Sequence, residues 1–406
     1  MAEALDRDTV RASDNSGVRR YNERLILQAL RRTPGASKAE LARELNLSTQ
    51  AALRIVDDLE SAGLVVNRGR RFGGRGQPSI MYDLNPEGAF SIGAHIGRRG
   101  LELVLMDFLG QVVAQSSMRY DYPLPDDAIG AIGAFVDQQR AGAPLVSSRL
   151  VGLGVAMPWF IGEWRDKLEI GEPQAAAWKT SEFDQRLTER CSLPILFEND
   201  GNAATLAELF LGQGRATKSF IYIYIGTFVG GGVALDGAIR SGMNGNAAAF
   251  ASMMVPPPEG GSGQPFSSLF ERASVYVLEK QVFDRLGRRV DLQNSPAVLA
   301  ECPELTEAWV TSSADALAFA ILNINNVLDV ETVVIDGSLP SDMLDAIIGA
   351  TGTGVEAMRH VEMFPPTIIR GEIGRHARVI GAGLLPLFSS YGANMDTLLK
   401  RAIFQT

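Results

Sequence analysis

The sequence predicts a protein of two parts, a small helical module with a β-hairpin followed by a larger α/β body. Its 406 residues exceed the usual size of one domain. Residues 19–75 carry twelve Lys or Arg against six Asp or Glu, a net charge of +6, whereas the other residues carry 26 against 41, a net charge of −15. Beyond Pro86, apolar strands alternate with amphipathic helices, the arrangement of an α/β domain.

The overall composition is that of a globular protein. Hydrophobic residues make up 46%, charged residues 21% and aromatic residues 7%, which excludes collagen-like, disordered and disulfide-stapled chains. Cys191 and Cys302 are the only cysteines and lie far apart, so we expect two buried thiols in a reducing compartment. There is no apolar run of 18 residues and no signal-peptide pattern, so we expect a cytoplasmic protein without membrane contact.

Three helices are predicted in the amino-terminal module. Residues 1–18 are polar and aperiodic, and we expect a mobile tail. A first helix spans about 21–31. Ser37 and Glu40 form an S-x-x-E capping box at the start of a second helix. A third helix, capped by Ser48, runs to about Ser61.

A β-hairpin with a basic, glycine-rich tip follows these helices. Residues 64–66 and 79–82 predict two short strands, and the connection 67–78 holds four Arg and four Gly. Three helices followed by such a hairpin are typical of a winged helix-turn-helix, which we expect over residues 19–85.

The third helix has an apolar face and a polar face. Ala52, Ile55, Val56 and Leu59 have the spacing of core residues, and the opposite face can meet base edges in the major groove. Arginines of the hairpin suit phosphates or a narrow minor groove. We therefore expect a double-stranded DNA operator as partner, contacted by Ser37, Ser48, Thr49, Gln50, Leu53, Arg54, Arg68, Arg70, Arg71, Arg75 and Gln77. The alternatives are a solvated helix face and a flexible basic linker.

Residues 86–406 form the α/β body. Residues 92–96, 101–106 and 112–116 predict a three-stranded meander, and 220–225 with 232–235 resemble the start of a second one. Two meanders, each followed by a crossover, suggest a duplicated fold with a cleft between two lobes. Further strands are predicted at 150–156, 195–198 and 332–335, and further helices at 203–210, 305–327 and 380–388.

Two motifs are placed where strands of the body end. Phe197–Ala204 puts Asn199 and Asp200 at the end of a strand and before a helix, where ligands bind in open α/β clefts. A carboxylate beside an amide can hold vicinal hydroxyl groups, whereas the alternative is that Asp200 only caps the next helix. Tyr224–Gly232 is a glycine-rich strand–turn–strand of the phosphate-loop type.

These segments, in this order, resemble the ROK (repressor, open reading frame, kinase) family, in its branch with an amino-terminal winged helix. The resemblance covers the chain from about residue 18 to its last residues. It implies an actin-like, hexokinase-type fold of two lobes, association into homodimers or homotetramers, and a sugar or sugar derivative as effector. The expected effector-binding residues are Asn199, Asp200, Gly226, Thr227 and Asn244.

The sequence also departs from the pattern of the family's kinases. Their first phosphate loop reads Asp-x-Gly-Gly-Thr, whereas this chain has His95-Ile96-Gly97-Arg98-Arg99. Ala249, Ser252 and Phe270 stand where the resemblance implies sugar-contacting Glu, His and Glu. The family's zinc ligands align with Ser252, Gly261, Gly263 and Ser268, so we expect no zinc and no other cofactor. Trp159 and Trp178 either line the cleft or belong to the core.

The sequence thus predicts a regulator rather than an enzyme. We expect a DNA-binding repressor of carbohydrate-related genes, controlled by a sugar-like effector and without kinase activity. One alternative is a constitutive DNA-binding protein whose body only holds the dimer together. The other alternative is a sugar kinase that carries a DNA-binding module.

Overall fold

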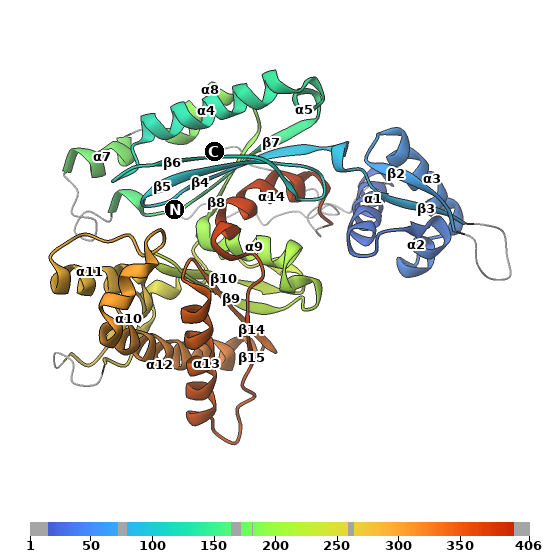
Figure 1. Cartoon of the computed structure of the whole chain (residues 1–406). Helices are drawn as coiled ribbons and strands as arrows, with labels where there is room; N and C mark the ends of the chain where they lie inside the picture. The colour runs from blue at the N-terminus through green and yellow to red at the C-terminus, as the bar shows by residue number, and fades with distance from the viewer. Residues whose placement is uncertain (1–14, 72–78, 164–171, 181, 259–263, 394–406) are drawn as a thin grey trace, which may run out of the picture.

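The computed structural model describes residues 15–71, 79–163, 172–180, 182–258 and 264–393 (Figure 1). Two of the predicted DNA contacts, Arg75 and Gln77, lie outside the described residues, as do Gly261, Gly263 and most of the predicted tail.

The amino-terminal module has the predicted winged helix-turn-helix arrangement. Its elements are α1 (Asn15–Arg32), β1 (Ala36–Ser37), α2 (Lys38–Glu44), α3 (Thr49–Ser61), β2 (Val65–Arg71) and β3 (Ser79–Leu84). β1, β3 and β2 lie side by side in an antiparallel sheet. Ile26, Leu30, Leu41, Val56 and Tyr82 are fully or almost fully buried and form the core of the module.

The body consists of two lobes with an identical strand order. The first lobe contains β4 (Phe90–Ile96), β5 (Gly100–Met106), β6 (Val112–Arg119), α4 (Pro125–Gly142), α5 (Pro144–Arg149), β7 (Leu150–Met157), α7 (Glu172–Thr180), α8 (Phe183–Cys191) and β8 (Ile195–Asn199). The second contains α9 (Asp200–Leu211), β9 (Phe220–Ile225), β10 (Val229–Leu235), β11 (Ala238–Ile239), β12 (Met254–Val255), β13 (Ser267–Ser268), α10 (Leu269–Ala273), α11 (Val275–Leu286), α12 (Pro303–Leu328), β14 (Thr332–Gly337), α13 (Ser341–Ala357) and β15 (Thr367–Arg370). The last described helix, α14 (Ala377–Tyr391), returns to the first lobe.

The strand order confirms the predicted duplication. The first sheet is ordered β6-β5-β4-β7-β8 and the second β11-β10-β9-β14-β15. In each sheet the first three strands of the lobe form an antiparallel meander, and the next two strands continue from its first strand in parallel. Each half of the body is therefore built on the same plan.

Strand alternation assigns each side chain to one of the two faces of a sheet. In β9, Ile221, Ile223 and Ile225 pack against α11, α12 and α13, while Phe220 and Tyr222 face the layer of α9 and α14. In β4 the same alternation sends Ile92 outward to α4 and places His95 on the inner side, at the cleft. α9 and α14 thus fill the space between the two sheets (Figure 1).

Glycines allow α14 to pack directly against its neighbours. A Cβ on Gly381 would lie 1.7 Å from the carbonyl oxygen of Ala203 in α9, and a Cβ on Gly154 would lie 1.9 Å from that of Ala382. Since such distances are sterically impossible, any larger residue at these positions would push α14 away from α9 and β7. α14 is therefore held tightly between the lobes.

The amino-terminal module is fastened to the body at the end of α14. Phe108 of the body is fully buried, and its ring packs edge-on against Tyr391 at 4.9 Å between centroids. Arg31 of α1 donates a hydrogen bond to the Phe108 carbonyl oxygen at 2.6 Å, and Arg24 donates one to the Gly392 carbonyl oxygen at 3.1 Å. One hydrophobic core runs through this seam, from α1 to α14.

Two further observations concern the chain as a whole. Cys191 and Cys302 are buried and unpaired, as predicted. Within the described ranges, the helices are too short or too polar to span a membrane.

Candidate functional site

α3 presents a polar face to solvent, as the sequence predicted. Ala52, Ile55, Val56 and Leu59 are buried in the module. Ser48, Thr49, Gln50, Leu53 and Arg54 are all exposed, and Leu53 keeps 41% of its surface accessible. The Ser48 hydroxyl accepts a hydrogen bond from the Ala51 N–H at 3.2 Å, which satisfies one of the free donors at the start of the helix.

Ser37 does not share this exposed position, and its inclusion among the DNA contacts is corrected. Only 5% of its surface is accessible. Its hydroxyl caps α2 by accepting from the Glu40 N–H, and its own N–H donates to the Glu40 carboxylate at 2.8 Å. The predicted capping box is confirmed, and it occupies the polar atoms that a DNA contact would need.

The arginines of the hairpin differ in their partners. Arg68 forms an ion pair with Asp83 at 2.7 Å, and Arg71 forms one with Glu40. Hydrogen bonds from Ser37 and the neighbouring charge of Arg71 lower the pKa of Glu40 to about 2. Arg70 has no ion pair with any residue that the structure describes, and it is exposed.

Arg54 is likewise exposed and has no described carboxylate partner. Of the three acidic residues farther along α3, the two nearest to Arg54 are already paired, Asp57 with Lys38 of α2 and Asp58 with Arg19 of α1. The positive charge of Arg54 therefore remains available at the exposed face of the helix.

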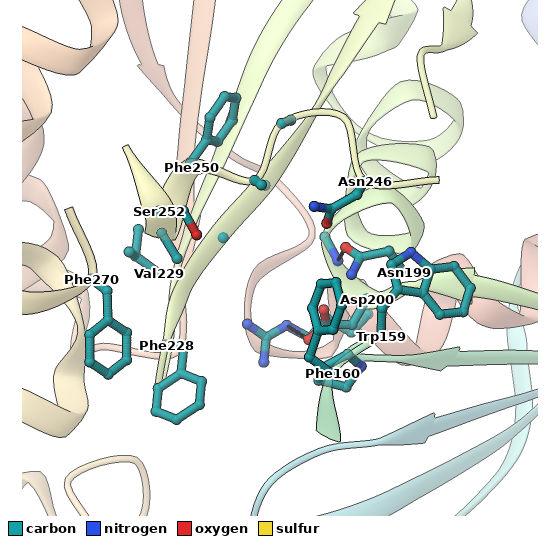
Figure 2. A pocket seen from close by; sticks show the side chains of 18 of the residues that line it. Trp159, Phe160, Asn199, Asp200, Phe228, Val229, Asn246, Phe250, Ser252 and Phe270 are labelled. Carbon is teal, nitrogen blue, oxygen red and sulfur yellow. Dashed lines mark hydrogen bonds and ion pairs between the residues drawn. The ribbon is translucent and has the colours of Figure 1, made fainter. Parts of the chain in front are cut away.

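The body holds a cavity between its lobes, at the start of α9. Asn199 is the helix cap, because its side-chain oxygen accepts from the Gly201 N–H at 2.9 Å, and Asp200 is the first helical residue. Both line the cavity together with Trp159, Phe160 and Asn246 (Figure 2). The alternative in which Asp200 itself caps the helix is therefore wrong.

Asp200 lies among positive groups from distant segments. Its carboxylate is 3.5 Å from Nε of Arg378 on α14 and 3.9 Å from Nε2 of His95 on β4. The other ring nitrogen of His95 is 3.3 Å from the carboxylate of Glu102, whose second oxygen lies 3.0 Å from Nδ1 of His376. A row of alternating acidic and imidazole groups thus runs from the cavity along the first lobe.

These neighbours shift the pKa values of the row. Burial alone would raise the pKa of Asp200, but the charge of Arg378 and the nearby His95 ring outweigh it and lower that pKa. Burial alone would lower the pKa of His95, but Asp200 and Glu102 outweigh it and raise that pKa. Burial would likewise raise the pKa of Glu102, yet the two histidines lower it. The row therefore favours ionised carboxylates beside a protonated His95.

The remaining predicted effector residues divide into three cases. Thr227 lines the cavity, and its hydroxyl accepts a hydrogen bond from Gln293 at 3.2 Å. Gly226 lies behind the lining, where a Cβ would come within 3.1 Å of the Arg378 guanidinium. Asn244 is exposed and outside the lining.

The loop geometry explains why Asn246, and not Asn244, lines the cavity. The chain turns at Gly245, which has a φ of 64°, and the Gly245 carbonyl oxygen accepts a hydrogen bond from the Trp159 indole at 2.7 Å. This contact directs the residue after Gly245 to the cavity. Asn246 is therefore the amide of this loop that lines the site.

The two tryptophans considered from the sequence have different roles. Trp159 lines the cavity, whereas Trp178 packs against Phe183 in the first lobe and donates to the Pro123 carbonyl oxygen at 2.9 Å. The cavity is also lined by Phe160, Phe228 and Arg378, which were not predicted as site residues from the sequence. Phe160 follows Trp159 directly, and this aromatic pair after a strand end was a usable signal.

The departures from the kinase pattern converge on the same cavity. Ala249 contributes to its lining, as do Ser252 and Phe270 (Figure 2). Arg98 also lines it, and Arg99 forms a two-pronged ion pair with Glu279 of α11, at 2.7 and 2.8 Å. In the part of the chain that the structure describes, His, Cys, Asp and Glu side chains form no group of three or more suited to a metal ion.

Comparisons with known proteins agree with both parts of the structure. Residues 91–387 match the ROK family, and residues 19–66 match the winged helix-turn-helix DNA-binding family. The fold is similar to that of a solved ROK family transcriptional regulator, a homologue of the E. coli MLC protein, with a TM-score of 0.70 and 18% identity over 94% of this chain and 99% of that one.

Curated relatives include regulators and kinases. The chain is 26% identical to the uncharacterized protein y4fQ of Sinorhizobium fredii over 91% of both chains. It is 21% identical to a putative xylose repressor of Caldicellulosiruptor sp., over 82% of this chain and 86% of the relative. It is 27% identical to a glucokinase of Halalkalibacterium halodurans, over 72% of this chain and 94% of the relative. The family match at residues 91–387 covers well over half of the sequence, and the chain therefore belongs to the ROK family, with a winged helix-turn-helix module at its amino-terminal end.

Proposed function

We propose that this protein is a DNA-binding transcription repressor whose affinity for its operator is set by a sugar or sugar derivative bound in the cleft of the body. The observation that carries the proposal is the exposed face of α3, with Gln50, Leu53 and Arg54 presented by a winged helix. Gln and Arg are suited to adenine and guanine edges, and an exposed Leu to a thymine methyl group. The xylose repressors among its relatives support the same assignment.

We propose that the body binds its sugar effector without phosphorylating it. A sugar kinase needs a carboxylate free to accept the proton of the attacking hydroxyl group. Here Asp200 is held by Arg378 and His95, and its lowered pKa makes it a poorer base. The first phosphate loop has no acidic residue, and its Arg99 is tied to Glu279. These features favour a regulator over an enzyme.

α14 offers a physical connection between the cleft and the DNA-binding module. Arg378 near its start meets Asp200 in the cleft, and Tyr391 at its end packs on Phe108, which contacts Arg31 of α1. A ligand that moves Arg378 therefore acts on a helix whose other end supports the module. Such a ligand changes operator affinity only if it binds the two arrangements unequally.

We further propose a cytoplasmic homodimer or homotetramer that reads a pseudo-palindromic operator. Two modules related by a two-fold axis would meet two half-sites, with a separation set by the distance between the modules.

The proposal is tested by titrating the full chain with DNA from upstream of its own gene and with a scrambled duplex of equal length, using fluorescence anisotropy. We expect the upstream DNA to bind at least about a thousandfold more tightly. Equal affinity for the two duplexes would remove the proposed function.

Two further assays address the alternatives. A constitutive DNA-binding protein would show the same operator affinity with and without every ligand that raises its unfolding temperature. A sugar kinase would release ADP from ATP and a hexose in a coupled assay, and we expect no rate above the background without protein.

A further inference from the structure

Two cavities meet at one pair of arginines. The first is the cleft beside Asn199 and Asp200, and the second lies between the edge of the first sheet and the start of α14. Both are lined by Gly97, Arg98, Thr227 and Arg378. These residues therefore form the boundary through which a ligand in one cavity reaches the other.

Arg98 has hydrogen-bonding groups without acceptors. Its Nε and Nη1 atoms are buried, and no described acceptor lies within hydrogen-bonding distance of them. The guanidinium lies 5.1 Å from the centre of the Tyr276 ring, and burial lowers its pKa to about 10. Because buried donors in folded proteins are almost always paired with protein or with ordered water, these N–H groups, at the lining of two cavities, are available to an acceptor that a ligand brings.

Arg378 faces the same boundary. Its Nε is also without a hydrogen bond, since the Asp200 oxygen at 3.5 Å is near it only as an ion pair. Its guanidinium is fixed over the Tyr224 ring at 4.2 Å. Two ring-supported guanidinium groups at one boundary are suited to a carboxylate or phosphate, which accepts several N–H bonds at once.

The charge of the second cavity favours an anion as well. Its lining includes one carboxylate, that of Glu102, and five arginines, which are Arg98, Arg99, Arg119, Arg375 and Arg378. Arg99 and Arg119 are offset by Glu279 and Asp291 behind them. Arg378 is offset by Asp200, so the excess positive charge comes from Arg98 at the boundary and from Arg375 near it.

One wall of the first cavity is aromatic. Phe228 and Phe270 pack edge-on at 4.9 Å, and Phe228 also meets Tyr276 at 6.0 Å, the ring that supports Arg98. Trp159 and Phe160 lie near Asn199 and Asp200, away from Phe228 and Phe270 (Figure 2). Hydroxyl groups placed against Phe228 and Phe270 would lose their hydrogen bonds to water, so this wall favours an apolar substituent.

We propose that the effector is an anionic sugar derivative with an apolar substituent, its phosphate or carboxylate group held between Arg98 and Arg378. The apolar substituent packs on Phe228 and Phe270, and the ring hydroxyls face Asn199 and Asn246. This inference rests on the proposed function, because it names the chemical class of the effector.

The test is a set of five probes measured by isothermal titration and thermal unfolding of the full chain. Glucose and glucose 6-phosphate differ in charge, and phenyl β-glucoside and phenyl β-glucoside 6-phosphate differ in the same way with an apolar group present. Phenyl β-glucuronide replaces the phosphate with a carboxylate. We expect at least one of the two charged phenyl probes to bind most tightly, and the preference between them identifies the anion.

Two variants assign the contacts. Arg98→Gln is expected to weaken the binding of the best charged probe by about tenfold to a hundredfold, the usual range for hydrogen bonds to a charged group. The same variant is expected to bind phenyl β-glucoside with unchanged affinity. Arg285→Gln, an exposed arginine of α11 outside both cavities, is the matched control and is expected to change neither.

The outcome is separable from that of operator binding. The inference is overturned if the charged phenyl probes bind no better than phenyl β-glucoside, if no probe binds, or if Arg98→Gln leaves their affinity unchanged. Operator affinity is measured on the same preparations without probes, so a neutral effector would leave the proposed repressor intact.

Discussion

Phe108 is the residue at which the attachment of the DNA-binding module can be measured. Its ring is fully buried and touches Tyr391 of α14, while the guanidinium of Arg31 lies 5.6 Å from its centre. Phe108→Ala removes this ring and leaves a cavity in the seam. Replacement of a buried Phe by Ala costs about 3–5 kcal/mol. Since about 1.4 kcal/mol is a factor of ten, the seam should open about a hundredfold to a few thousandfold more often.

The exchange rates of the backbone amide hydrogens measure how often the seam opens. We expect exchange in α1 to accelerate by that factor, while amides of α12, at the far side of the second lobe, keep their rates. Phe108→Leu is the matched control, because it retains most of the apolar volume and should accelerate exchange by no more than about tenfold. The reasoning is refuted if α1 exchanges at the wild-type rate in Phe108→Ala, or if the two variants behave alike.

Three further predictions concern the recognition helix, the His95 contacts and the connection between the lobes. Arg54→Ala should weaken operator binding by about 1–3 kcal/mol and relax the preference at one base pair in anisotropy titrations, whereas Arg43→Ala, an exposed control on α2, should weaken selected and scrambled DNA alike. Because the folded pKa of His95 is raised, its stabilising contribution is complete below about pH 6.5 and is lost as the pH rises through the folded pKa. The stability difference between wild type and His95→Gln in urea unfolding should therefore be larger at about pH 6 than at about pH 9, and a difference independent of pH would contradict this account. Arg99→Met leaves the buried Glu279 carboxylate without its partner and should cost about 3–5 kcal/mol in the same assay, and Arg99→Met combined with Glu279→Gln should recover most of the loss.

Local patterns were sufficient to predict much of the fold. The spacing of Ala52, Ile55, Val56 and Leu59 identified the buried face of α3, because helical periodicity depends on residues only a few positions apart. The Ser37–Glu40 box marked the start of α2 for the same reason. Strands of the two meanders were found from continuous apolar runs, which a doubly covered sheet requires.

The same local reasoning failed where hydrogen bonds within the protein decide the position of a residue. Ser37 was expected to meet DNA, but its cap to Glu40 holds it inside the module. Asn244 was expected in the cleft, but the turn at Gly245 and its bond to Trp159 bring Asn246 there instead. The role of Ser37 follows from the capping box that the sequence itself predicted, whereas the position of Asn246 could not be predicted without knowing the partner of Gly245.

The cleft depends on residues brought together from distant parts of the chain. Arg378 meets Asp200 only because α14 returns between the two sheets, and no local pattern near residue 378 indicates that contact. Phe228 meets Tyr276 because α11 packs beside the turn after β9. Sequence periodicity predicted α14 as a helix, yet its role as the connection between cleft and module follows from the tertiary packing.

Selection of DNA from a random duplex pool by the full chain tests the central claim most directly. After selection, the affinities of wild type and Arg54→Ala for the recovered sequence and for its scrambled version are compared at one fixed salt concentration. We predict a recurrent two-part motif that wild type binds at least about a thousandfold more tightly than the scrambled duplex, with a much smaller ratio for Arg54→Ala. Recovery of no common motif, or the same ratio for both proteins, would contradict the assignment of α3 as the element that reads DNA.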